Sequence, residues 1–257
     1  MDGLLDGKVV IVTGASSGIG AATALVMANQ GAKLLLAARR VQESEQTLDA
    51  ARQAGAEAEF VRTDVTVESD VAAMVAKAVN VFGRIDGAFN NAGAGFPADA
   101  DWPDNTPDQY DRTFALNVRG VWLCMKYELK AMLQSGGGSI VNNSSISGLR
   151  GGTAEVYSAS KSAVNSLTTS AAVKYGKQGV RVNAVAPGII HTQGWQNRFD
   201  ATPGLKEGFE RGIPLGRAAR PSEVGDVAAW LCSDMSSYVT GTVIPVDGGF
   251  TQTTQRP

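Results

Sequence analysis

The chain has 257 residues, of which 44% are hydrophobic and 19% charged, and its formal net charge is −2. This composition is typical of a globular protein, and the lack of a basic excess argues against direct binding to DNA or RNA. Two cysteines are too few for a disulfide framework, and no cluster of His, Cys, Asp and Glu suggests a metal site. No apolar run is long enough for a membrane span or a signal peptide, so we expect a soluble, cytoplasmic protein without a membrane partner.

Short apolar runs alternate along the chain with longer helical patterns. Such runs are typical of strands that helices cover on both faces, and the alternation predicts a parallel sheet. The expected strands are residues 8–12, 33–37, 59–62, 86–89, 139–143, 181–185 and 243–246, and the expected helices include 21–30, 71–82, one long helix over 110–132, 157–175 and one beginning at Pro221. No repeat or linker divides the chain. The sequence therefore predicts a single α/β domain over residues 1–257, with a doubly wound parallel sheet of about seven strands.

Residues 188–220 interrupt this alternation. Glycines and prolines are mixed there with large apolar side chains, including Trp195, Phe199 and Phe209. This mixture indicates a partly helical flap over a substrate, which packs in one state and lifts in another, or else a static surface excursion. The sequence does not decide between the two.

A glycine-rich turn follows the first expected strand, and residues 13–20 have the sequence TGASSGIG. A strand, a glycine turn and a helix start place main-chain N–H groups and the positive helix end against a phosphate. Gly14 permits the tight turn, Gly18 lets a ligand approach the main chain, and Gly20 allows close packing of helix on strand. No lysine follows, so this is not a nucleotide-hydrolysing P-loop. The pattern favours a dinucleotide site over a turn without a ligand.

The end of the second expected strand indicates which dinucleotide is bound. Residues 37–40 have the sequence AARR, without the acid that usually binds the ribose 2′-hydroxyl of NAD. Arg39, with Arg40 beside it, offers a guanidinium to a 2′-phosphate. The sequence therefore favours NADP(H) over NAD(H), and the alternative is a solvated arginine at the start of a surface helix.

A group of polar residues predicts a catalytic site. Tyr157 and Lys161 are four residues apart near the start of an expected helix, so both side chains lie on one face. Ser144 and Ser145 follow the fifth expected strand, at the sheet edge where open α/β folds bind ligands. Asn117 interrupts the apolar stripe of the long helix, where a buried polar side chain needs a partner. A Tyr–Lys pair alone also fits an ordinary helix start. Together with the serines and Asn117, it indicates a catalytic site instead.

In this order the motifs resemble those of the short-chain dehydrogenase/reductase family, and the resemblance covers the chain from Lys8 to Phe250. It joins the glycine turn to Asn91, the Tyr157/Lys161 pair and the sequence NAVAPG at residues 183–188. It implies a Rossmann-like fold, a small alcohol or ketone substrate, and a homo-oligomer, either a tetramer or a dimer.

The resemblance also implies roles for single residues. Tyr157 would exchange a proton with the substrate oxygen, Ser145 would hydrogen-bond that oxygen, and Lys161 would hold the nicotinamide ribose hydroxyls. Asn117 would anchor a water that links Lys161 to solvent. Since a positive charge about 4 Å away lowers a phenol pKa by several units, Lys161 and an oxidised nicotinamide together are expected to make Tyr157 a base near neutral pH. The implied cofactor-binding residues are Gly14, Ser16, Ser17, Gly18, Ile19, Gly20, Arg39, Arg40, Asp64, Val65, Asn91, Ala92, Gly93, Tyr157, Lys161, Pro187, Gly188, Ile190 and Thr192.

Some alternatives stay open. Ser144 lies 13 residues before Tyr157, the commoner family spacing, so either serine could be catalytic. The flap aromatics, with Phe96 and Trp102, indicate a compact apolar or cyclic substrate. The favoured function is hydride transfer between NADP(H) and a secondary alcohol or ketone. The alternatives are reduction of C=N or C=C bonds, and a dinucleotide-sensing regulator without turnover.

Overall fold

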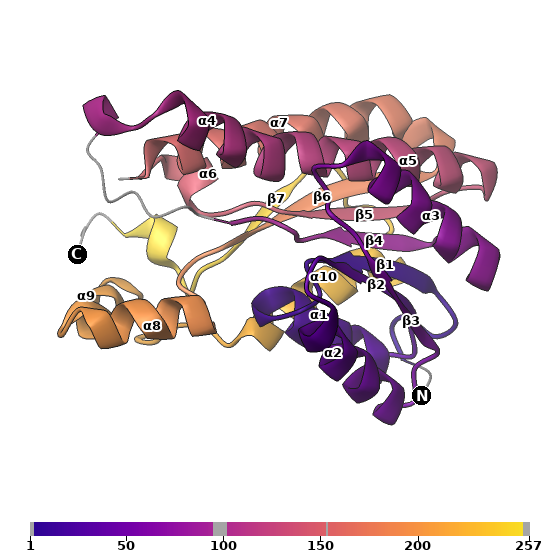
Figure 1. Cartoon of the computed structure of the whole chain (residues 1–257), viewed down its shortest axis with the longest axis horizontal. Coiled ribbons are helices and arrows are strands. Elements are labelled where there is room, and N and C mark those ends of the chain that lie inside the picture. The colour runs from indigo at the N-terminus through magenta and orange to yellow at the C-terminus, as the bar shows by residue number, and fades with distance from the viewer. Residues whose placement is uncertain (1–2, 95–101, 153, 254–257) are drawn as a thin grey trace.

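The computed structural model describes residues 3–94, 102–152 and 154–253, with only the backbone at Trp102. Seven parallel strands form one sheet in the order β3-β2-β1-β4-β5-β6-β7 (Figure 1). The strands are β1 (Val9–Thr13), β2 (Lys33–Ala38), β3 (Ala58–Arg62), β4 (Gly87–Asn90), β5 (Gly138–Asn143), β6 (Val180–Pro187) and β7 (Val243–Val246). The predicted doubly wound parallel sheet is confirmed, and most strand ends differ from the expected ones by a residue or two.

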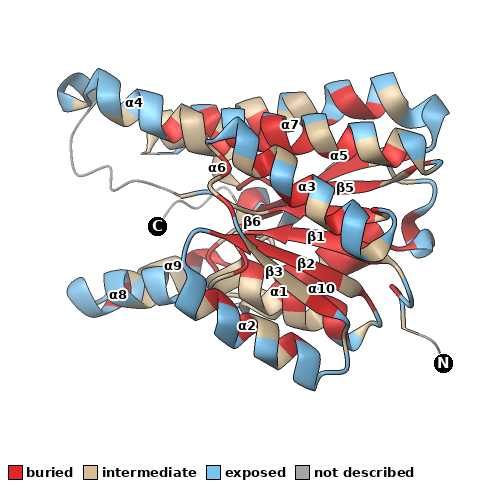
Figure 2. Ribbon diagram, turned by 45° about the vertical axis from the view of Figure 1, so that its right-hand side comes forward, coloured by how far each residue is buried: buried red, intermediate tan, exposed pale blue. Residues whose placement is uncertain are grey.

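Helices cover both faces of the sheet (Figure 2). They are α1 (Gly18–Asn29), α2 (Val41–Gln53), α3 (Glu68–Phe82), α4 (Pro107–Phe114), α5 (Gly120–Gln134), α6 (Ser147–Arg150), α7 (Glu155–Tyr175), α8 (Gln193–Ala201), α9 (Leu205–Gly212) and α10 (Pro221–Cys232). Successive side chains of a strand point to opposite faces. Ile11 of β1 accordingly packs with α3, α5 and α7, whereas its neighbours Val10 and Val12 pack with α1 and α10. The strands are therefore buried on both sides, which explains their continuous apolar sequences.

The expected long helix over 110–132 is not one regular helix. A π-helical turn, Ala115–Arg119, joins α4 to α5 and contains Asn117, which is fully buried. A π turn holds one more residue than an α turn and often marks a functional site. The polar residue in the apolar stripe thus lies where the helix widens, and its side chain bonds to Ala94 and Ser160, outside this helix.

The connection between β1 and α1 depends on two glycines. Gly14 has a φ of +66°, in the left-handed region that favours glycine. A Cβ at Gly20 would lie 2.2 Å from the carbonyl oxygen of Gly14, so no larger residue fits there. The helix begins at Gly18 rather than at residue 21, and the glycine turn therefore supplies its first main-chain N–H groups.

The segment 188–220 is partly helical, as predicted, and contains α8 and α9. Trp195 lies 5.5 Å from Phe199 and 5.4 Å from Phe209, measured between ring centroids. With Ile189 and Ile213, these rings form an apolar cluster separate from the two that flank the sheet. Whether this flap lifts stays a prediction.

No helix in the described part of the chain combines the length and the hydrophobicity needed to cross a bilayer.

Candidate active site

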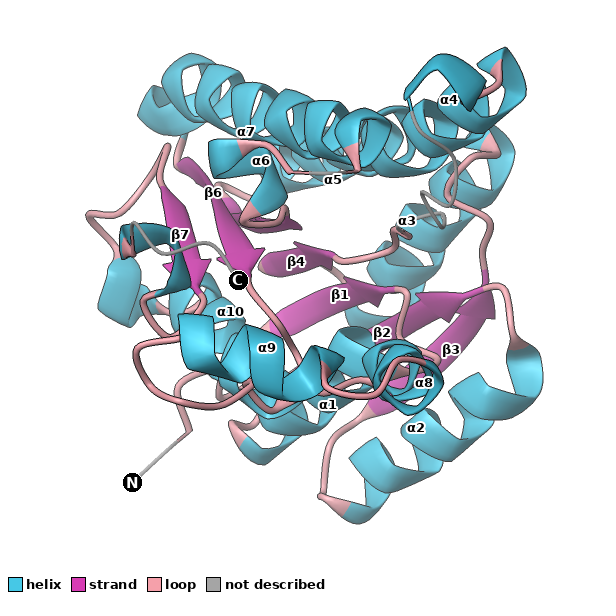
Figure 3. Ribbon diagram, turned by 90° about the vertical axis from the view of Figure 1, so that its left-hand side faces the viewer, coloured by secondary structure: helices cyan, strands magenta, loops and turns pink. Residues whose placement is uncertain are grey.

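Because the strands are parallel, their carboxyl ends meet at one edge of the sheet (Figure 3). Thr13, Asn90 and Asn143 end β1, β4 and β5 at this edge. The chain leaves β1 toward the face that carries α1 and leaves β4 toward the opposite face, which carries α4 and α5. Open α/β sheets bind ligands where the connections diverge in this way. Most of the predicted site residues come together around this point.

The turn before α1 combines a helix N-terminus with a guanidinium. Ser17 is the N-cap residue of α1, but its side chain does not cap the helix. Instead, Arg40 donates hydrogen bonds to Ser16 Oγ at 2.9 Å and to Ser17 Oγ at 2.6 Å. The positive helix end, where Gly18 and Ile19 form the first turn, and this arginine together make a site suited to phosphate.

Arg39 points to a different partner, Asp64. Its Nη1 lies 3.9 Å from Asp64 Oδ2. Burial raises the pKa of the Asp64 carboxyl, but hydrogen bonds from Thr66 and the charge of Arg39 outweigh it, so this pKa lies below its usual value. The Asp64 side chain is therefore an ionised hydrogen-bond acceptor at neutral pH. The next residue, Val65, is buried. The arginine that contacts the phosphate turn is Arg40, whereas the sequence analysis favoured Arg39 for this role.

The segment Asn91-Ala92-Gly93 is tied to the end of β1. The main-chain N–H groups of Asn91 and Ala92 each donate to Thr13 Oγ1 at 3.0 Å. The Asn91 side chain donates to the Thr13 carbonyl at 3.0 Å. These bonds fix the segment across the tip of the neighbouring strand, next to the glycine turn.

Lys161 lies on α7 with only 3% of its surface exposed. Its ammonium donates a 2.7 Å hydrogen bond to the main-chain carbonyl of Asn143, at the tip of β5. Burial lowers the pKa of Lys161 to about 8. An ammonium has three donor hydrogens, and this contact uses one of them.

Tyr157 lies one helical turn before Lys161, whose Nζ is 5.7 Å from the centre of the phenol ring. Burial raises the pKa of Tyr157, and a hydrogen bond with the Ser145 side chain partly opposes this. The expected lowering of this pKa is therefore not found in the protein by itself. The reasons are the desolvation of the phenol and the direction of the ammonium toward Asn143.

The two candidate serines point to different partners. Ser144 Oγ donates to the main-chain carbonyl of Lys161 at 3.2 Å and is buried against α7. Ser145 Oγ accepts from the N–H of Ser147 at 3.1 Å and shares a hydrogen bond with Tyr157. The geometry thus directs Ser145, and not Ser144, toward the phenol.

Asn117 connects the π turn to the loop that follows β4. Its Oδ1 accepts from the N–H of Ala94 at 3.1 Å, and its Nδ2 donates to the Ala94 carbonyl at 3.0 Å and to Ser160 Oγ at 3.1 Å. A Cβ at Gly93 would lie 3.1 Å from Asn117 Oδ1 and 3.3 Å from Lys161 Nζ. The amide and the ammonium therefore flank Gly93, although the asparagine also holds the loop in place.

The chain leaves β6 through residues that begin the flap. The Pro187 carbonyl accepts from the N–H of Ile146 at 3.1 Å, and the N–H of Gly188 donates to Val246 of β7 at 3.0 Å. Ile190 is buried. Thr192 caps α8, and its methyl group would lie 3.5 Å from a Cβ at Gly18. The start of the flap thus lies against the phosphate turn.

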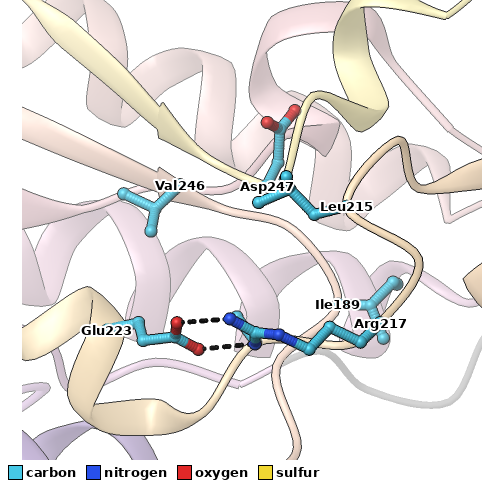
Figure 4. Close-up of a pocket in the computed structure, with 8 residues that line it drawn as sticks. Ile189, Leu215, Arg217, Glu223, Val246 and Asp247 are labelled. Carbon is cyan, nitrogen blue, oxygen red and sulfur yellow. Dashed lines mark hydrogen bonds and ion pairs between the residues drawn. The ribbon is translucent and has the colours of Figure 1, made fainter.

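A small pocket of about 100 Å³ lies at the base of the flap (Figure 4). Ile189, Leu215 and Val246 give it an apolar lining. Arg217 donates two hydrogen bonds to the Glu223 carboxylate, at 2.8 and 2.7 Å. Tyr157, Ser145 and Lys161 do not line this pocket, so it is separate from these candidate catalytic residues. Sequence reasoning missed this ion pair, although Glu223 falls at the third position of a helix that begins with proline.

Sequence reasoning also missed a buried acid. Glu128 of α5 is fully buried and accepts a 2.9 Å hydrogen bond from Asn90 Nδ2. The available signal was an acid in the apolar stripe, next to Leu129. Of the aromatic residues expected near a substrate, Phe96 and the side chain of Trp102 lie outside the described residues.

Comparisons with known proteins identify the family of the chain. A family model described as enoyl-(acyl carrier protein) reductase matches residues 14–251. An A-factor type gamma-butyrolactone 1′-reductase of Streptomyces virginiae is 44% identical, over 97% of each chain. A cis-4-hydroxycyclohexanecarboxylate dehydrogenase of Sinomonas cyclohexanicum is 42% identical, over 95% of this chain and 96% of its own. The crystal structure of levodione reductase superposes with a TM-score of 0.92 at 37% identity, over 96% of this chain and 99% of the other.

These relatives are reductases and dehydrogenases that match over nearly the full length of both chains. The fold, the order of the motifs and the family match agree with one another. The chain belongs to the short-chain dehydrogenase/reductase family and is an oxidoreductase that uses a nicotinamide cofactor.

Proposed function

We propose that this enzyme interconverts a secondary alcohol and a ketone on a compact, largely apolar or cyclic substrate, with NADP(H) as cofactor. The observation that carries the proposal is the convergence of Ser145, Tyr157 and Lys161 at the carboxyl edge of the sheet, beside a phosphate turn that faces Arg40. When bound, the nicotinamide supplies or accepts the hydride.

Tyr157 is proposed as the acid in ketone reduction and the base in alcohol oxidation. Since burial raises the pKa of the phenol, Tyr157 holds its proton at neutral pH and can donate it. The phenol O–H bond breaks as an O–H bond forms on the former carbonyl oxygen. Ser145, already hydrogen-bonded to the phenol, is placed to donate to the same oxygen and stabilise its developing negative charge.

Lys161 and Asn117 are proposed to support this proton transfer. With one hydrogen on the Asn143 carbonyl, the ammonium keeps two others for the ribose hydroxyls and for the approach to Tyr157. A pKa near 8 lets Lys161 exchange protons close to physiological pH. Asn117 flanks Gly93 opposite this ammonium, where a water held by the amide would continue the path toward solvent.

The cofactor preference follows from the charge around the phosphate turn. Both Arg39 and Arg40 follow β2, and no acid occupies the position that would bind a ribose 2′-hydroxyl. A charge-assisted hydrogen bond contributes roughly 1.5–3 kcal/mol, enough for a preference of one to two powers of ten. The glycine cradle at Gly14 and the uncapped start of α1 fit the pyrophosphate.

The substrate class rests on the flap and on the relatives. The apolar cluster of Trp195, Phe199 and Phe209 lies on the segment that starts against the phosphate turn. The names of two relatives specify ring compounds, a gamma-butyrolactone and a hydroxycyclohexanecarboxylate. The description of the family model keeps C=C reduction as a second candidate.

Compact cyclic ketones are expected to oxidise NADPH faster than short polar ketones, because the flap offers apolar contacts. A panel of both classes, with cyclic enones added, measures this preference through kcat/KM. Product analysis of the enone reactions distinguishes a reduced C=O from a reduced C=C bond. Faster turnover of short polar ketones would contradict the proposed substrate class.

Tyr157→Phe is expected to lower kcat by about 10²–10⁴-fold, because it removes the proton donor. The Kd for NADPH should stay within about threefold, since the ring and the Lys161–Asn143 contact remain, and fluorescence titration measures it. Tyr175→Phe on the same helix is the matched control and should leave kcat unchanged. Retained turnover in Tyr157→Phe would exclude the phenol as the acid.

Ser145→Ala is expected to lower kcat/KM by about 10²–10³-fold, as loss of a donor to a developing oxyanion does. Ser144→Ala should instead lower stability by about 1 kcal/mol through the lost bond to α7, with little effect on kcat/KM. Steady-state kinetics and urea unfolding of both variants measure this. The reverse order of kinetic effects would assign the role to Ser144.

Wild-type enzyme is expected to have a higher kcat/KM with NADPH than with NADH. Arg40→Ala should raise the KM for NADPH by about tenfold or more while changing that for NADH little, because a guanidinium pairs with the 2′-phosphate. Arg39→Ala tests the neighbouring guanidinium in the same way, and Arg52→Ala on α2 is the control. A preference of the wild type for NADH would refute the assignment.

A further inference from the structure

Glu128 is a buried acid that the proposed chemistry does not use. It lies on α5, between the core residues Met125 and Met132, and none of its surface is exposed. Its Oε2 accepts from Asn90 Nδ2 at 2.9 Å, whereas Oε1 has no hydrogen-bond partner among the described residues. Within the same part of the chain it forms no ion pair. A buried carboxylate without a cation is costly, so this position needs a physical reason.

The Glu128 carboxyl stands at one end of a chain of side-chain hydrogen bonds. This chain runs from α5 over β4 and β5 to α7. Asn90 Nδ2 donates also to Asn142 Oδ1 at 3.1 Å, and Asn142 Nδ2 donates to Thr168 Oγ1 of α7 at 2.9 Å. Asn90 and Asn142 are register partners on β4 and β5. One set of side chains thus links α5, β4, β5 and α7 just beneath the edge where the site lies.

The next residue along each strand tip points the other way and contacts the site. Asn143 Nδ2 donates to Asn91 Oδ1 at 2.9 Å, and the Asn143 carbonyl accepts from Lys161. Asn91 in turn donates to Thr13 beside the phosphate turn. Two asparagine pairs, one on each face, therefore fix the same two strand tips. A shift of the buried pair moves the carbonyl that holds the ammonium.

The surroundings of Glu128 favour its neutral form. The titratable groups that interact with it are the thiols of Cys124 on its own helix and Cys232 on α10, and burial raises the pKa of both. Its only hydrogen-bond partner among the described residues is the Asn90 amide, which connects through the Asn142 amide to the Thr168 hydroxyl, so this chain carries no charge. Burial raises the pKa of Glu128 to about 7, although the Asn90 hydrogen bond opposes this.

We propose that Glu128 is a positioning residue that acts as a neutral hydrogen-bonding group. Through Asn90 and Asn142 it sets the strand tips at which Asn143 holds Lys161 and Asn91 meets the cofactor. The inference rests on the proposed function in that these two residues bind the cofactor. Asn90 Oδ1 is a second buried oxygen without a partner in the described structure, and a proton on Glu128 supplies a donor to this cluster of acceptors.

Substitutions at Glu128 separate positioning from packing. Glu128→Gln keeps a neutral acceptor of the same shape and should leave kcat and the Kd for NADPH within about threefold of wild type. Glu128→Leu removes the polar group. It should lower kcat and raise the Kd for NADPH, each by about ten- to 100-fold, because the catalytic and binding groups are displaced. Glu45→Gln, exposed on α2, is the charge-matched control. Should Glu128→Leu fail to fold, Thr168→Val interrupts the same hydrogen-bond chain from α7. It should likewise lower kcat and raise the Kd for NADPH.

The pH dependence of unfolding tests the charge state. An acid whose pKa is raised from 4.5 to about 7 on folding stabilises the protein fully below pH 4.5, and this contribution is lost as pH rises toward 7. The Tm of wild type should therefore fall between pH 5 and 8 relative to that of Glu128→Gln. Equal pH profiles for the two proteins would overturn the neutral form.

Unchanged kcat and Kd in a folded Glu128→Leu, measured well below its Tm, would overturn the positioning role and leave a purely structural one. The Kd and the pH profile of Tm require no substrate. If wild type binds NADPH but reduces no ketone in the panel, the proposed function fails while these two measurements still test Glu128.

Discussion

The contact between the Lys161 ammonium and the Asn143 carbonyl joins the two halves of the site. Burying an ammonium costs several kcal/mol unless hydrogen bonds compensate it, and a pKa of about 8 shows that compensation is incomplete here. The contact fixes α7 on the tip of β5. Because Tyr157 lies one turn earlier on the same helix, the position of the phenol depends on this bond and on whatever holds the strand tip.

The strand tips are held by amides because the sheet edge is where main-chain pairing ends. Inside the sheet, strands of a doubly wound fold pair with neighbours and bury apolar side chains on both faces. At the edge, loops diverge, and asparagine side chains link the neighbouring strand ends to one another. Asn90 pairs with Asn142 on the α5 side, and Asn91 pairs with Asn143 on the other. Through the Asn143 carbonyl, which holds Lys161, this network also bears on the geometry of the site.

The flap is built differently from the rest of the domain. Its apolar cluster is separate from the two that flank the sheet. An ion pair between Arg217, near the end of the flap, and Glu223 of α10 connects the flap to the rest of the domain. This pair is partly solvent-exposed, and such pairs contribute little to stability. The flap therefore has its own small core and is joined to the domain at its base by main-chain hydrogen bonds between Ile189, His191 and Ala219, whereas Lys161 lies on α7 and its acceptor Asn143 in β5.

The sequence by itself determined the local features. Apolar runs predicted the strands, glycine spacing predicted the turn before α1, and the i, i+4 rule placed Tyr157 and Lys161 on one helical face. These follow from periods and torsion angles that a few residues fix. The sequence favoured Ser145 but left Ser144 open as an alternative, and it offered no reason for Asn143 at the end of its strand.

Only the tertiary structure decided which side chains meet. It turned Ser145 toward Tyr157, brought Arg40 rather than Arg39 to the phosphate turn, and widened the helix at Asn117. It also paired Asn143 with Asn91 across two strands. The physical reason is that strand register and helix docking set these contacts between residues far apart in the chain. Local periodicity carries no information about the partner that a buried polar group will find.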